Sequence, residues 1–131
     1  MGRDQLIEDL REKLGGRSDV RLALLFGSWA RGQQGPESDI DIAVSGQADR
    51  LALAAELSAA TGREVQVQSL DADLGVPLLE EVVRDAVVVA QAHPGAAASW
   101  RTRALITLET DRPWYARMRD AYLRRITDRG L

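Results

Sequence analysis

Two short segments, Gly27-Ser28-Trp29-Ala30-Arg31-Gly32 and Ser38-Asp39-Ile40-Asp41-Ile42, decide how this sequence folds. The first follows Val20–Phe26, a hydrophobic stretch with the pattern of a buried β-strand. That stretch stops at a Gly-Ser pair typical of a turn, and Trp29-Ala30-Arg31 then indicates a short helix ending at Gly32. The second segment has the pattern of another strand. The sequence therefore predicts a strand, a tight turn into a short helix, a polar loop and a second strand.

The two aspartates of the second segment share one face of the predicted strand. Side chains alternate along a strand with a rise of roughly 3.3 Å per residue, so Asp39 and Asp41 lie about 6 to 7 Å apart at their bases. Ile40 and Ile42 point to the opposite face, where they are expected to be buried. Two carboxylates so placed suit Mg²⁺, which completes its shell with phosphates and water. Taken alone, however, an Asp-x-Asp pattern is also common in strands and turns that bind nothing.

The glycine-serine turn has features of a phosphate-binding site. A helix that begins there directs free N–H groups and the positive end of its dipole toward an anion. Gly27 permits close backbone approach, Ser28 offers a hydroxyl, and Arg31 could screen phosphate charge if it turns inward. The alternative is an ordinary turn followed by a solvated arginine. Together with the aspartates, the turn predicts a site for a magnesium-nucleotide, and ATP is the expected substrate.

The combined pattern resembles a known family. The string from Phe26 to Gly32, the ten residues between Ser28 and Asp39, and the Ser38–Asp41 segment are similar to the signature of minimal nucleotidyltransferases, the MNT group of the DNA polymerase beta superfamily. The length, the later strand at 64–70 and the arginine-rich C-terminal helix ending Arg129-Gly130-Leu131 resemble the MNT antitoxins encoded beside HEPN-domain toxins.

The resemblance implies both an activity and roles for individual residues. It implies transfer of AMP from ATP onto a tyrosine of the toxin, which silences the toxin's RNase activity. By the same resemblance, Gly27 and Ser28 contact nucleotide phosphates, and Asp39 and Asp41 are the catalytic, Mg²⁺-binding residues. Arg31 and Ser38 complete the set of expected nucleotide-binding residues.

One carboxylate of the family pattern is absent. Relatives carry an aspartate in a later strand where this sequence has Gln66. An amide has no charge and no useful basicity, so it cannot help to deprotonate an attacking hydroxyl. Glu64 would substitute only if the strand register differs, and Asp71 and Asp73 are expected in a loop. The sequence is therefore compatible with a slow enzyme or with an inactive one.

Composition limits the other possibilities. The 131 residues, 45% of them hydrophobic, fit one compact domain with a real core. No apolar run approaches the roughly 18 residues of a membrane span, and the first residues open an amphipathic helix rather than a signal peptide, so we expect a cytoplasmic protein without membrane contact. Cysteine is absent and His93 is the only histidine. Thiol catalysis is therefore excluded, and a histidine metal cluster or a Ser-His-Asp triad is not expected.

The charge is unevenly distributed along the chain. The net charge is −3, yet the segment 96–131 contains eight arginines and four acidic residues. This basic segment either meets an acidic partner or is simply solvated. Direct binding of nucleic acid is not expected, because the whole chain is acidic and only 5% of its residues are aromatic.

The rest of the pattern predicts an α/β (α+β) fold, in which a mixed sheet packs with helices. Residues 1–95 are the expected nucleotidyltransferase core, and residues 96–131 the C-terminal helical extension of the same domain. The extension is predicted as two helices, 100–109 and 113–129, broken at Asp111-Arg112-Pro113. The second helix carries an apolar stripe at four-residue spacing, formed by Trp114, Met118, Tyr122 and Ile126. We favour packing of this stripe on the protein's own core over docking of the toxin, and we expect Trp29 in the core rather than stacked on a nucleobase.

Three functions therefore remain open from the sequence. The first is an adenylyltransferase antitoxin that modifies a HEPN toxin. The second is a pseudo-enzyme that neutralises the toxin by binding alone, which Gln66 favours. The third is a transferase acting on a small molecule such as an aminoglycoside, which is disfavoured because the chain lacks an added substrate domain.

Overall fold

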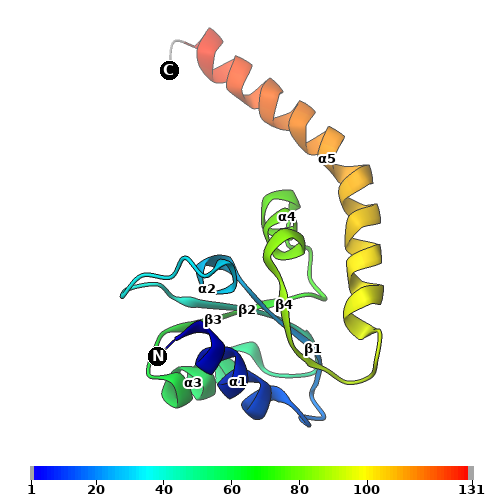
Figure 1. Ribbon diagram of the computed structural model, residues 1–131. Coiled ribbons are helices and arrows are strands. Elements are labelled where there is room, and N and C mark those ends of the chain that lie inside the picture. Colours follow the sequence, from blue (N-terminus) through cyan, green and yellow to red (C-terminus); the bar gives the residue numbers. More distant parts are fainter. Residues whose placement is uncertain (1, 130–131) are drawn as a thin grey trace.

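A computed structural model describes residues 2–129 of the chain. Helices and strands alternate through the first two thirds, and one long helix completes the described part (Figure 1). The elements are α1 (Arg3–Leu14), β1 (Val20–Phe26), α2 (Gly27–Arg31), β2 (Ile40–Gly46), α3 (Arg50–Thr61), β3 (Val65–Ser69), α4 (Val76–Asp85), β4 (Val87–Gln91) and α5 (Ala96–Asp128). The end of the chain at Gly130-Leu131, included in the predicted C-terminal helix, lies outside the described residues.

The four strands form one mixed sheet in the order β3-β2-β1-β4. The central strand β1 pairs antiparallel with both β2 and β4, whereas β2 pairs parallel with β3. A parallel pair needs a crossover connection, and α3 supplies it between β2 and β3. The predicted mixed α/β sheet is therefore confirmed.

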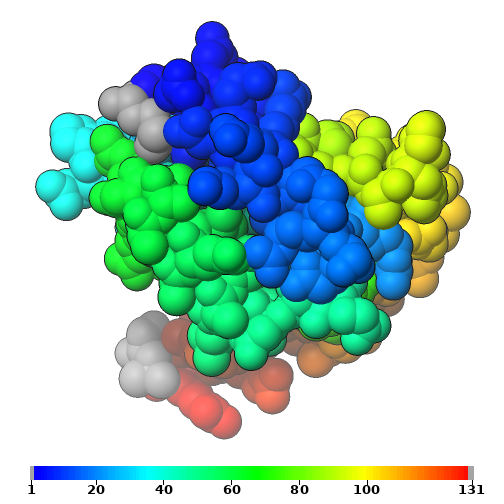
Figure 2. All heavy atoms as spheres, turned by 90° about the horizontal axis from the view of Figure 1, so that it is seen from below, coloured from blue at the N-terminus to red at the C-terminus, as the bar shows by residue number. Residues whose placement is uncertain are grey.

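The two faces of the sheet have different coverings. Helices α1 and α3 cover one face, as the space-filling view from below shows, and α4 and the start of α5 lie on the other (Figures 1 and 2). The short α2 follows β1 and contacts both sides, because Trp29 and Ala30 pack in the α1–α3 core and Arg31 pairs with α4. Ile40, Ile42 and Val44 of β2 are buried in the α1–α3 core, while Ala43, one position out of phase, packs in the core under α4. This alternation sends Asp41 to the α4 side of the sheet, as expected for a strand with period two.

Local signals in the sequence account for most of the element boundaries. The Asp49 side chain caps α3 by accepting hydrogen bonds from the backbone N–H groups of Leu51 and Ala52, at 3.0 and 3.1 Å. Gly62 ends the same helix in a left-handed conformation with φ +71°. β1 has the predicted bounds. The second strand is predicted over about Asp39–Val44, and β2 begins one residue later, so that Asp39 stands immediately before the strand.

The predicted break at Asp111-Arg112-Pro113 is wrong, because α5 runs through it as one helix of 33 residues with Pro113 inside. Proline lacks the N–H that would bond to the carbonyl of Glu109 and crowds that turn, which bends a helix without necessarily ending it. Figure 1 shows α5 changing direction between its yellow and orange parts. Despite this length, α5 is rich in charged residues, and no helix within residues 2–129 is apolar enough to cross a membrane.

The favoured interpretation of the apolar stripe on α5 is also wrong. The first half of α5 packs against α4 through the buried residues Ala104 and Leu108. Beyond it the helix leaves the domain, and the side chains of Trp114, Met118 and Tyr122 are about half exposed (57%, 48% and 59%). Four-residue spacing shows that one side of a helix is apolar but does not show what covers that side.

The core beneath β2 should hold the aspartates in register. Ile42 is completely buried, so Ile42→Ala should lower the free energy of unfolding by about 2 to 5 kcal/mol through lost contacts and a residual cavity. Leu51→Ala is the matched control, because Leu51 is 85% exposed and its truncation should change stability by less than about 0.5 kcal/mol. Urea unfolding measures both, and equal effects would contradict this account of the core.

Candidate active site

The turn after β1 touches the second aspartate directly. Gly27 begins α2 with φ +76°, a conformation that favours glycine. A Cβ atom at this position would collide with the carboxylate of Asp41. The sheet explains the contact, because Phe26 is the register partner of Asp41 in the antiparallel pair of β1 and β2. The structure thus brings together the turn and the carboxylate that the sequence analysis assigned to one site.

Asp39 and Asp41 lie on the same side of the sheet. The intervening Ile40 is completely buried on the opposite face, and the charge of Asp39 acts on the carboxyl of Asp41. Asp39 also accepts a hydrogen bond from the side-chain amide of Gln66, with 3.2 Å between Nε2 and Oδ2. The two carboxylates therefore converge on one region, next to the Gly27 turn.

Gln66 occupies the position next to this carboxylate pair. In the parallel pairing of β2 with β3, Gln66 is the register partner of Asp41, and the backbone of Glu64 bonds to Ile40 just before it. The register therefore leaves no carboxylate on β3 beside Asp41. Asp71 lies in the loop after β3, where the Ser45 hydroxyl and the Gly46 N–H donate to its two oxygens at 2.8 and 3.0 Å.

Asp73 lies in a loop, as the sequence predicted, and the structure places it outside the site. It is in the same loop as Asp71 and accepts a hydrogen bond from the N–H of Gly75 at 2.9 Å. Neither loop aspartate stands in for the absent carboxylate. Within residues 2–129, no group of three or more acidic, histidine or cysteine side chains is placed to hold a metal ion.

Two acidic residues of α4 belong to the surroundings of the site, although the sequence analysis did not identify them. Arg31 forms a short ion pair with Asp85, at 2.6 Å, and a longer one with Glu81, at 3.8 Å. The Asp85 side chain is only 3% exposed, and it also pairs with Arg84. Hydrogen bonds from Arg84 and then from Arg31 hold the pKa of Asp85 below its usual value. The guanidinium of Arg31 is thus directed at α4.

The carboxyl group of Asp41 has an unusually high affinity for a proton. Burial is the main cause that raises its pKa, and the negative charges of Glu81 and Asp39 act in the same direction. Arg31 opposes them, and the result is a pKa of about 6 against an ordinary value of 3.8. A bound divalent cation would stabilise the ionised form of carboxylates that lie close together and are partly shielded from water. The donor set accordingly fits Mg²⁺ held by two carboxylates, with phosphates and water as the remaining ligands.

Trp29 is in the core, as predicted, and also supports the loop that leads to Asp39. Its side chain is 1% exposed, and its indole N–H donates to the carbonyl of Ser38 at 3.2 Å. The guanidinium of Arg63 lies over the ring, 5.0 Å from its centre. The hydroxyl of Ser38 accepts a hydrogen bond from the N–H of Gly35 at 2.8 Å. Ser38 and Trp29 therefore fix the end of the polar loop just before the first aspartate.

Comparison with known protein families identifies the family to which the chain belongs. The sequence profile of the family described as polymerase beta, nucleotidyltransferase matches residues 8–94, which include the turn, both aspartates and the whole sheet. The chain belongs to the polymerase beta nucleotidyltransferase family. The family resemblance and the fold predicted from the sequence are confirmed. No curated protein matches the chain significantly.

Solved structures of nucleotidyltransferase fold are similar over nearly the whole chain. A toxin–antitoxin structure with AMP-PNP is 24% identical with a TM-score of 0.69, covering 93% of this chain and 99% of the other. The complex of a tri-AMPylated Shewanella oneidensis HEPN toxin with an MNT antitoxin is 22% identical with a TM-score of 0.61, covering 92% and 95%. A toxin–antitoxin mutant with two aspartates changed to glutamate is 22% identical with a TM-score of 0.66, covering 93% and 99%. This nucleotidyltransferase therefore shares its fold with these chains, including the long C-terminal helix.

The raised pKa of Asp41 predicts a pH-dependent cost to stability. The folded protein takes up a proton on this group more readily than the unfolded chain does, because its pKa of about 6 exceeds 3.8. The ionisation of Asp41 therefore does not lower the free energy of unfolding below about pH 4. It lowers it increasingly between about pH 4 and pH 6, and by its full amount above about pH 6. In metal-free protein, Asp41→Asn should raise the melting temperature at pH 8 but not at pH 4. Asp111→Asn, at an exposed position of α5, should show no such difference, and an equal gain for Asp41→Asn at both pH values would contradict the explanation.

Proposed function

We propose that the chain is an antitoxin that transfers AMP from ATP to a tyrosine of a HEPN-domain toxin and thereby neutralises it. The contact between the Gly27 turn and Asp41, with Asp39 beside it, is the observation that carries this proposal. Membership of the nucleotidyltransferase family supports the reaction class. The fold likeness to antitoxin chains, one of them in complex with a tri-AMPylated toxin, supports the choice of acceptor and partner.

The roles of the residues follow from their positions. Asp39 and Asp41 would hold Mg²⁺, which supplies positive charge to the phosphates and orients them. The N–H groups at the start of α2 and the hydroxyl of Ser28 would donate hydrogen bonds to phosphate oxygens of ATP. Arg31, directed at Asp85, would act mainly by keeping α2 against α4, and it would reach phosphate only by leaving that ion pair.

The transfer itself is a substitution at the α-phosphorus of ATP. The tyrosine oxygen forms a bond to this phosphorus, the bond to the bridging oxygen breaks, and pyrophosphate leaves with the bonding electrons. The phenol proton passes to water, because Gln66 offers no base beside Asp41. Positioning and charge stabilisation provide most of the acceleration in such transfers, so the reaction would be slow but not absent. Its dependence on ATP fits a cytoplasmic protein.

A second function is favoured by one observation. Gln66 takes the place beside Asp41 and binds Asp39 through its amide, which leaves the site with two carboxylates. A chain that had lost catalysis would still neutralise its partner by binding it. The two functions differ in whether the partner becomes covalently modified.

Mass spectrometry separates these two functions. The purified chain is incubated with ATP, Mg²⁺ and the protein encoded by the neighbouring gene, and we expect the partner to gain mass in increments of one AMP. Asp39→Ala should reduce the rate by about 10²-fold or more, because part of the metal site is lost. Asp111→Ala, at an exposed position of α5, is the control and should leave the rate unchanged. A stable complex without any increments would instead support the binding antitoxin.

Restoring the missing carboxylate should accelerate the transfer. General-base assistance contributes typically about 10²- to 10⁴-fold, so Gln66→Asp should increase the initial rate of AMP incorporation by about 10-fold or more. Gln68→Asp is the matched control, because it adds the same charge on the same face of β3 but beside Ala43 rather than Asp41. Equal rates for the two variants would show that the position beside Asp41 has no special role.

A further inference from the structure

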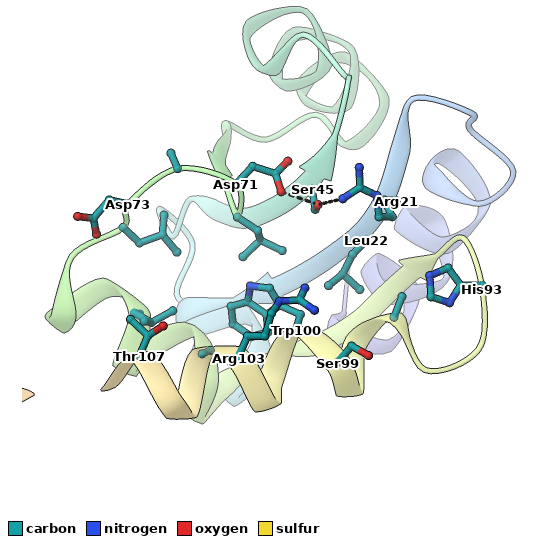
Figure 3. A pocket seen from close by; sticks show the side chains of 16 residues that line it. Arg21, Leu22, Ser45, Asp71, Asp73, His93, Ser99, Trp100, Arg103 and Thr107 are labelled. Atoms are coloured by element: carbon teal, nitrogen blue, oxygen red, sulfur yellow. Dashed lines mark hydrogen bonds between the residues drawn. The ribbon is translucent and has the colours of Figure 1, made fainter. Parts of the chain in front are cut away.

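A recess of about 570 Å³ lies on the same side of the sheet as the aspartates but at its other end. Its walls are the start of β1, the end of β2, the loop after β3 and the first four turns of α5 (Figure 3). Ser45, on its wall, is four residues along β2 from Asp41, which corresponds to about 13 Å at roughly 3.3 Å per residue. Leu22 and Leu74, at this end of the apolar cluster between sheet and α4, also line the recess. The recess is therefore separate from the candidate active site.

Two arginine side chains, Arg21 and Arg103, line the recess. Among the described residues, Arg103 on α5 has no hydrogen-bond or ion-pair partner. Within the part of the chain that the structure describes, the side chain of Arg21 on β1 makes one long hydrogen bond, 3.4 Å from the hydroxyl of Ser45, and no ion pair. Figure 3 shows Arg21 beside Ser45 on one wall and Arg103 beside Trp100 on the wall formed by α5, with His93 on the loop before α5. Guanidinium groups on facing walls, one of them engaged only by a long hydrogen bond, are suited to bind an anionic group.

The acidic residues of the recess are already occupied by hydrogen bonds. Both oxygens of Asp71 accept hydrogen bonds, from Ser45 and Gly46. Burial alone would raise the pKa of Asp71, but these two hydrogen bonds and the charge of Arg21 outweigh it and lower the pKa. Asp73 accepts from the N–H of Gly75. Asp71 compensates Arg21 in part, and Asp73 adds a second acidic group to the wall, so the recess suits a group of low negative charge, such as one phosphate group held by the two arginines, better than a highly charged triphosphate.

The recess also has an aromatic wall. Trp100, on the first turns of α5, is half-buried and lines the recess beside Arg103, and Leu22 and Leu79 add apolar surface (Figure 3). An indole face favours stacking with a planar ring. A volume of this size is typical of sites for small organic ligands. The ligand chemistry indicated is therefore a planar ring joined to a group of low negative charge.

We propose that this recess is a second ligand site that binds a nucleoside monophosphate, with the phosphate between Arg21 and Arg103 and the base against Trp100. The site is independent of Mg²⁺ and of the aspartate pair, so it does not rest on the proposed transfer reaction. A chain with this site would bind AMP and ATP at different places.

Isothermal titration of the full chain with AMP, in EDTA to exclude metal-dependent binding, tests the proposal. We expect one AMP to bind per chain, and Asp41→Ala should bind equally well. Adenosine and inorganic phosphate should each bind at least about 10-fold more weakly than AMP, since each lacks one of the two contacts. Metal-free ATP should also bind more weakly than AMP, because of its larger charge.

Variants on one helix provide the matched comparison. Arg103→Ala should weaken AMP binding by about 10-fold, the effect expected for one lost charge-assisted contact. Arg117→Ala removes an exposed arginine of α5 outside the recess and should leave binding unchanged. Both positions are exposed, so folding should be preserved, which circular dichroism checks. Absence of binding up to about 5 mM AMP, equal effects of the two variants, or loss of binding in Asp41→Ala would each overturn the proposal.

Discussion

The close contact between the backbone of Gly27 and the carboxylate of Asp41 is the constraint on which the site depends. It follows from the pairing of β1 with β2, which sets Phe26 opposite Asp41 and brings the start of α2 against the second strand. Burial of Ile40 and Ile42 fixes this register, because a slip by one residue would turn both isoleucines toward the site and both aspartates toward the core. The Gly27 turn and the two carboxylates are therefore held by the sheet itself, whose rigidity suits the proposed catalytic site.

The secondary-structure elements around the candidate site that the sequence predicted correctly are those determined by local signals. Alternation of apolar residues defines β1 and β2, and the glycines at 27 and 32 mark the bounds of the short helix between them. The neighbourhood of Asp41 was predictable only in part. The resemblance to a family identified Gln66, whereas Glu81 and Asp85 reach the site through the packing of α4, which no spacing in the sequence indicates.

The long C-terminal helix shows the same limit of local reasoning. A proline within a helical pattern predicts a break, but Pro113 removes only one N–H from a helix that has good helix-forming residues on both sides. The apolar stripe beyond it was expected on the core because isolated amphipathic helices are marginal in water. Its exposure instead leaves Trp114, Met118 and Tyr122 outside the domain. Such residues are favoured at protein interfaces, which is consistent with a protein that acts with a partner.

The charge distribution around Asp41 gives a physical reason for an amide at position 66. Burial, and after it the charges of Glu81 and Asp39, already raise the pKa of Asp41, with Arg31 as the opposing charge. A third carboxylate beside Asp41 would add to this repulsion in the absence of metal, whereas the amide of Gln66 donates a hydrogen bond to Asp39 and helps to hold it. In the proposed site the two carboxylates would remain as ligands for a cation, and only a base would be lost. Charge stabilisation and positioning contribute more than a base to phosphoryl-type transfer. Glutamine in place of a carboxylate at position 66 would therefore preserve the larger part of the proposed catalytic site. This favours the proposal of a slow adenylyltransferase over that of an inactive chain.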